Sequence, residues 1–184
     1  MANRLSRVER DQCAQALATS ACVNLRKSSR AITRWYDKEL EPCGLRSTQL
    51  AILLNVAAVD RPTYSDVARE LVTDLSTLSR NLAILEKQGL VRTEPGRDSR
   101  RKIIWLTVDG MNRIRKAIPL WARTQQAFLS QFGDKRWSEF LDGLGATISS
   151  AHDAENLPPG AQSESEPVPR VQRKLGRKKA ALKT

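Results

Sequence analysis

One stretch of polar side chains, between residues 74 and 87, is the part of the sequence best suited to contacting another molecule. Leucines at helical spacing predict the buried side of a helix there. They are Leu75, Leu78, Leu82 and Leu85. The opposite face begins with small hydroxyls and continues with bases, namely Ser76, Thr77, Arg80, Ala83 and Lys87. Short hydroxyls allow a close approach, and arginine can pair bidentately with guanine or contact a phosphate, so this face suits the major groove of DNA.

A second basic segment follows this helix. The hydrophobic period changes from 3.6 to 2, which predicts strands at 90–94 and 102–107 with a polar turn between them. From Arg92 to Lys102 the chain has five bases and two acids. The bases of the turn itself are Arg97, Arg100 and Arg101. A narrow minor groove attracts an inserted arginine, and Asp98 could hold a neighbouring guanidinium in place.

Helices must position both segments. We expect one long helix over 12–41, a second from Ser47 to just before Arg61, and a short third helix capped by Ser65. Asp74 is the expected N-cap of the helix over 75–87, and Gly89 the residue that ends it. Together with the strands, these elements form a winged helix-turn-helix over about 45–108.

Two more helices are expected over about 109–150, the first with a kink at Pro119 and the second capped by Asp134. They and the helix over 12–41 have apolar stripes and flank the winged module. Such stripes need a partner, and symmetric self-association is the simplest one. The expected fold is therefore mainly α with a small β-hairpin wing, flanked by N- and C-terminal dimerisation helices.

Composition narrows the class of protein. The chain has 184 residues, with 31 Lys+Arg against 20 Asp+Glu and a formal charge of +11, which favours an anionic partner such as nucleic acid. One histidine and three cysteines leave too few groups for Ser-His-Asp catalysis or a zinc site, so we expect no enzyme activity, metal or cofactor. The sequence shows no secretory signal or membrane span, and its cysteine usage fits a reducing cytoplasm.

The ends of the chain differ from its middle. Residues 1–11 are expected to be flexible and 151–184 to form a disordered tail, because the tail has no periodic apolar face. Within it, 151–169 is acidic and proline-containing, whereas 170–184 has seven bases and no acid. The basic end could add sequence-independent attraction to phosphates, or it could be a solvated tail with no specific role.

From Leu45 to Gly110 the sequence resembles the multiple-antibiotic-resistance regulator (MarR) family of bacterial transcription factors. The matching segments are 65–71, 74–82, 85–91, Asp98-Ser99-Arg100 and 104–110. The resemblance implies a homodimer that binds a pseudo-palindromic operator, usually to repress, and that releases it in response to a phenolic or lipophilic ligand or an oxidant. It also places Ser76, Thr77, Ser79 and Arg80 in the major groove, with Arg100 in the minor groove positioned by Asp98.

Cys22 admits two interpretations. Cys22, Ser29-Arg30-Ala31 and Tyr36 are similar to the first helix of the organic-hydroperoxide sensors within that family. However, Arg26 and Ser47 stand where those sensors have tyrosines, and an unreactive core cysteine is the favoured interpretation. Trp35, Tyr36 and Trp121 could likewise line an effector pocket or belong to the core.

The leading hypothesis is a homodimeric, cytoplasmic regulator that binds double-stranded DNA sequence-specifically. A winged-helix module that binds protein or RNA without operator specificity is the first alternative. An enzyme is the second, although scattered carboxylates provide no acid–base constellation for it.

Overall fold

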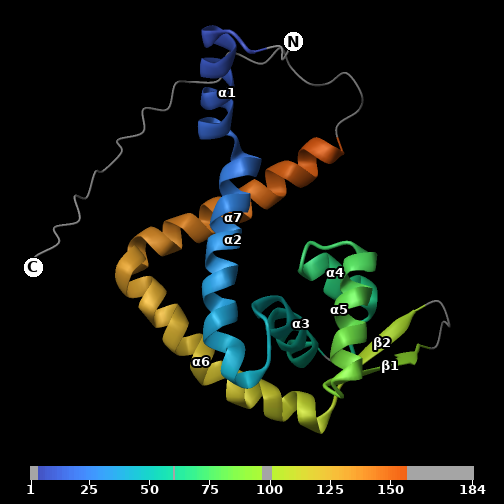
Figure 1. The fold of residues 1–184 in the computed structure, drawn as a ribbon. Helices are drawn as coiled ribbons and strands as arrows, with labels where there is room; N and C mark the ends of the chain where they lie inside the picture. Colours follow the sequence, from blue (N-terminus) through green and yellow to red (C-terminus); the bar gives the residue numbers. More distant parts are fainter. Residues whose placement is uncertain (1–3, 60, 97–100, 157–184) are drawn as a thin grey trace, which may run out of the picture. The chain divides into compact units, whose positions relative to one another are not determined.

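The structure is a computed structural model that describes residues 4–59, 61–96 and 101–156. The chain divides into a unit formed by Ser29–Asp142 and a second unit formed by Met1–Ser28 with Gly143–Thr184. The described part is mostly helical, with one two-stranded antiparallel hairpin (Figure 1). The expected fold class, mainly α with a β-hairpin wing, is confirmed.

The elements in chain order are α1 (Arg7–Thr19), α2 (Ala21–Leu40), the 3-10 helix η1 (Glu41–Cys43), α3 (Ser47–Ala58), α4 (Tyr64–Glu70), α5 (Leu75–Lys87), β1 (Val91–Pro95), β2 (Lys102–Leu106), α6 (Val108–Phe132) and α7 (Asp134–Glu155). The two strands of the sheet, β1 and β2, are consecutive in the chain.

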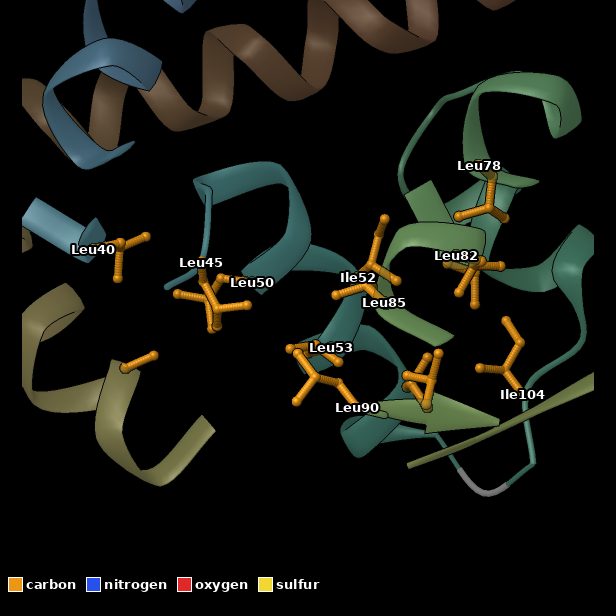
Figure 2. Packing of buried hydrophobic residues seen from close by; sticks show 14 of the residues in the cluster. Leu40, Leu45, Leu50, Ile52, Leu53, Leu78, Leu82, Leu85, Leu90 and Ile104 are labelled. Atoms are coloured by element: carbon orange, nitrogen blue, oxygen red, sulfur yellow. The ribbon is translucent and has the colours of Figure 1, made fainter. Parts of the chain in front are cut away.

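The hydrophobic core lies between α3, α5 and the hairpin. Leu78, Leu82 and Leu85 are buried and point from α5 toward Leu53 of α3 and Ile104 of β2 (Figure 2). Burial of these side chains fixes which face of α5 is left to solvent. The prediction for Leu75 is wrong: its side chain is 53% exposed, because it is the first residue of α5 and lies beyond the edge of the core.

The predicted strands are confirmed, and a third segment joins them. Val91 pairs with Leu106 and Arg92 with Trp105 in the antiparallel register. The segment before α4 extends the hairpin, since the Ile104 N–H donates to the Pro62 carbonyl at 2.9 Å. At the other end, the Gly96 N–H donates to the Arg101 carbonyl at 2.6 Å. This bond fixes the base of the basic turn.

The predicted cap of α4 is wrong by two residues. Thr63, not Ser65, is the N-cap, and it forms a capping box with Asp66. The Asp66 N–H donates to Thr63 Oγ1 at 3.3 Å, while the Thr63 N–H donates to Asp66 Oδ2 at 3.0 Å. Thr63 has the extended backbone of a cap because it pairs with β2, so Ser65 falls inside the helix.

The expectation of one helix over 12–41 after a flexible start is also wrong. Helix α1 already begins at Arg7, because Ser6 and Glu9 form a capping box. The helix is interrupted at Ser20, whose ψ of 118° is not helical and whose hydroxyl accepts the Val23 N–H at 3.3 Å. Ser20 thus begins α2 anew.

The last helix, α7, extends to Glu155, five residues past the predicted end near 150, because no glycine or proline interrupts 151–155. The remainder of the predicted tail, 157–184, lies outside the described residues.

Candidate nucleic-acid interface

The exposed start of α5 is organised by Asp74. Its Oδ1 accepts the Thr77 N–H at 2.7 Å and the Ser76 hydroxyl at 2.5 Å. The hydrogen bonds from the Ser76 side chain and from Thr77 hold the pKa of Asp74 far below its usual range. Because the Ser76 proton points to Asp74, the lone pairs of that hydroxyl remain available to accept from a base amino group. Asp74 is thus both the predicted cap and a positioning residue.

Arg80 lies one turn further along the same face. Its Nη2 donates to Thr77 Oγ1 at 3.0 Å, so the guanidinium is held beside the hydroxyl pair. Ser76, Ser79 and Arg80 are exposed, and Thr77 is half-buried. The structure therefore brings Ser76, Thr77 and Arg80 together, as the helical spacing predicted. Lys87 is exposed in the last turn of α5, about 20 Å from Asp74 along the axis at the helical rise.

The role of Asp74 in orienting Ser76 was missed at the sequence level. The signal was present, because an aspartate at the N-cap followed two residues later by serine places both side chains over the first turn. The contact between Arg80 and Thr77 follows the i, i+3 spacing that makes helix neighbours.

The hairpin provides further positive charge. Arg97, Asp98 and Arg100 lie outside the described residues, whereas Arg101 is exposed where the turn closes. On the stem, the guanidinium of Arg92 lies 5.5 Å from the centre of the Trp105 ring. That of Arg61 lies 5.1 Å from the same ring. Both are within the range of cation–π attraction, so the stem is basic as well as the turn.

We expect the Asp74 contacts to appear as a pH dependence. The folded pKa of Asp74 is lowered, so the stability it provides is fully present above its unfolded pKa, about 3.9, and is lost as the pH falls through the folded value. The asparagine introduced by Asp74→Asn would cap the helix without titrating. Urea unfolding at fixed protein concentration should therefore show wild type more stable than Asp74→Asn at pH 7, with the difference shrinking below about pH 4. A difference independent of pH would contradict this role.

The other candidate residues lie on α2 and α6. Tyr36 donates from its hydroxyl to Gln125 Oε1 at 2.5 Å, and burial raises its pKa. Trp35 packs edge-to-face on Tyr36, with ring centres 6.0 Å apart, and also against Phe128, with ring centres 6.4 Å apart. Cys22 is exposed, and Arg26 Nη2 lies 3.7 Å from its sulfur. Within the single chain, Cys22 is therefore not the core residue that the sequence favoured.

A cavity of about 120 Å³ lies between α2, α3 and α6. Its lining residues are Tyr36, Leu40, Ser47, Leu50, Ala51, Leu54 and Trp121. Tyr36 and Trp121 thus meet at one cavity, as expected of an effector pocket, whereas Trp35 is not among the residues that line it. All the lining side chains are uncharged, which favours a neutral occupant.

The described residues contain neither a candidate metal site nor a candidate membrane-spanning helix. They contain no group of three or more His, Cys, Asp and Glu side chains arranged to bind a metal ion. None of the helices among them is both long and apolar enough to span a bilayer.

The chain is similar to known regulators. Residues 44–102 match the model of the MarR family. The transcriptional regulator HosA of Escherichia coli O127:H6 is 31% identical over 129 residues, 68% of this chain and 93% of that protein. The organic hydroperoxide resistance transcriptional regulator of Bacillus subtilis is 30% identical over 105 residues, 56% of this chain and 71% of that protein. The M. tuberculosis regulator MosR, solved in complex with DNA, shares 33% identity and a TM-score of 0.67 over 75% of this chain and 99% of its own.

Proposed function

The chain belongs to the MarR family and is a DNA-binding transcriptional regulator, and from that premise we propose that it binds a pseudo-palindromic operator as a homodimer, most simply as a repressor. The start of α5 supports this proposal best. There Asp74 fixes the Ser76 hydroxyl, and Thr77 fixes the Arg80 guanidinium, on an exposed face backed by the core. Side chains ordered before binding lose less entropy on contact with base edges.

Dimer formation is supported by the apolar side chains that the single chain leaves exposed outside the winged module. They are Leu5, Val8 and Leu17 at the N-terminal end, Met111, Ile118 and Trp121 on α6, and Leu141 and Ile148 on α7. Exposed apolar surface of this kind favours association, and an identical partner is always present. We therefore assign 45–108 to DNA binding and the flanking helices, 12–41 and 109–150, to the dimer interface.

The decisive experiment combines sedimentation velocity with selection of bound fragments from random duplexes. We expect a dimer at micromolar concentration and an enriched inverted repeat whose half-sites are about one helical turn apart. A monomer, or equal affinity for scrambled and symmetric duplexes, would contradict the proposal. Preferential selection of structured RNA over duplex DNA would support the alternative of a winged-helix module without operator specificity.

Substituting Arg80 separates base reading from phosphate contact. If Arg80 reads a base, Arg80→Ala should relax the sequence preference by about 1–3 kcal/mol per half-site. Quantitative binding to the selected operator and to single-base variants measures this preference. Arg115→Ala is the matched control, because Arg115 is an exposed arginine on α6 that donates to Asn112. An equal loss on every sequence would make Arg80 a phosphate contact.

We infer that a small effector controls this binding. The cavity beside Tyr36 and Trp121 is somewhat smaller than the roughly 150 Å³ that holds benzene in an apolar protein cavity, so a single neutral ring would fill it after slight adjustment. Phenol should then weaken the operator complex of wild type but not of an Ala51→Leu variant, in which the cavity is filled.

The oxidant alternative places the sensor at Cys22. Loss of operator binding under hydrogen peroxide that persists in Cys22→Ser would exclude it.

A further inference from the structure

The first turns of α6 are fastened to the winged module. Thr107 Oγ1 donates to the Gly89 carbonyl at 2.7 Å and accepts the Gly110 N–H at 3.0 Å. One turn later, Arg113 Nη1 donates to the Cys43 carbonyl at 2.9 Å. These bonds join α6 to the end of the DNA-reading helix and to η1, so this half of α6 moves with the winged module.

Beyond Pro119, Leu120 still packs against the core, and the second half of α6 adds contacts with α2. Gln125 accepts the Tyr36 hydroxyl at 2.5 Å, and Arg123 Nη2 lies 3.6 Å from Glu39 Oε2. Beyond these polar contacts begins an aromatic cluster. Its members are Trp35, Phe128, Phe132, Trp137 and Phe140. This half of α6 therefore belongs with the helices we assign to the dimer interface.

Pro119 lies between the two halves, and α6 changes direction along its length (Figure 1). Proline has no N–H to donate to the carbonyl of Arg115, and its ring crowds that turn. Thr124 is buried, and its hydroxyl donates to the Leu120 carbonyl at 2.8 Å, which favours bending further. A proline at this position disfavours the helix locally, and such departures from local preference concentrate at functional positions.

We propose that Pro119 is a specificity-determining residue: its bend sets the angle between the winged module and the dimerisation helices, and hence the half-site spacing that the dimer accepts. This inference rests on the proposed homodimer. Residues 108–118 form a lever about 16 Å long at the helical rise. A change of about 20° at Pro119 would displace the far end of that lever by about 6 Å, nearly two base-pair steps of 3.4 Å.

The test uses the full-length protein and Pro119→Ala, which restores the missing donor. The matched control is Ile118→Ala. Ile118 is the neighbour of Pro119 and is 39% exposed, and its replacement by alanine leaves the backbone N–H donors of the helix unchanged. Both variants are titrated against the selected operator and against duplexes with one or two base pairs added to or removed from the spacer. Binding to a duplex with a single half-site is measured as well, and a thermal melt of each variant measures its stability.

We expect Pro119→Ala to bind the original spacing at least about tenfold more weakly, and to favour a spacer that is one or two base pairs different. Its affinity for a single half-site and its melting temperature should not fall, and Ile118→Ala should keep the wild-type order of preference among the spacers. A spacing profile identical to that of wild type would overturn the inference, as would an equal loss on every spacing and on the single half-site. If wild type itself prefers no symmetric duplex, the proposed operator-binding dimer fails first, and the inference fails with it.

Discussion

Gly110→Ala is expected to lower the free energy of unfolding by about 3 kcal/mol, the upper end of the usual range for overpacking. A Cβ atom at Gly110 would lie 2.1 Å from the Leu90 carbonyl oxygen and 2.9 Å from Leu106 Cδ1. The first obstacle is backbone at the start of the hairpin, so it cannot rotate away as a side chain would. The start of α6 must shift instead, which strains the bonds of Thr107 to Gly89 and Leu90.

The same substitution elsewhere in a helix should have the opposite sign. Gly143 lies inside α7, and a Cβ atom there would meet nothing within 4 Å in the single chain. Gly143→Ala should therefore stabilise the protein by about 0.5–1 kcal/mol through helix propensity alone. Urea unfolding followed by circular dichroism, at one protein concentration for all variants, measures both changes. A Gly110→Ala variant as stable as wild type would show that α6 does not press against Leu90.

Local patterns predicted those parts of the fold that depend on neighbours in sequence. The stripe of Leu78, Leu82 and Leu85 and the cap at Asp74 follow from one turn of helix, and the structure confirms both. The break at Ser20 could not be found in this way. A one-residue interruption barely changes the phase of an apolar stripe, so the periodicity on either side of Ser20 still reads as one helix.

The choice between Thr63 and Ser65 as a cap shows a second limit. Both hydroxyls precede the same short helix, and either could cap it in isolation. Pairing of Thr63 with Ile103 of β2, forty residues away, gives Thr63 the extended backbone of a cap. A contact so distant in sequence leaves no local pattern, and therefore sequence analysis placed the start of the helix too late.

In the candidate site, too, local sequence patterns predicted some features and missed others. Helical geometry predicted that Ser76, Thr77 and Arg80 share a face, and the structure adds the hydrogen bonds that orient them. For the effector pocket, Trp35 and Tyr36 were expected to act together. Adjacent residues on a helix point about 100° apart, so Tyr36 reaches the cavity while Trp35 packs on Phe128.

Arg100→Ala is expected to weaken operator binding at least about 30-fold, because losing a base-contacting arginine costs roughly 1–3 kcal/mol and a dimer loses two. Arg100 lies outside the described residues, between the two strands in sequence. On either side of it, the Gly96 N–H donates to the Arg101 carbonyl at the end of the paired strands. An arginine there can enter a narrow minor groove.

Arg101→Ala is the comparison that isolates this role. Arg101 is an exposed base in the same turn, and as a phosphate contact its loss should weaken all sequences alike and reduce the salt slope by about one per copy. Arg100→Ala should instead remove the preference for a narrow, A·T-rich flank, and Asp98→Asn should reproduce part of that loss if Asp98 positions the guanidinium. Sedimentation velocity should find all three variants dimeric. Unchanged operator affinity in Arg100→Ala would leave sequence recognition to α5 alone.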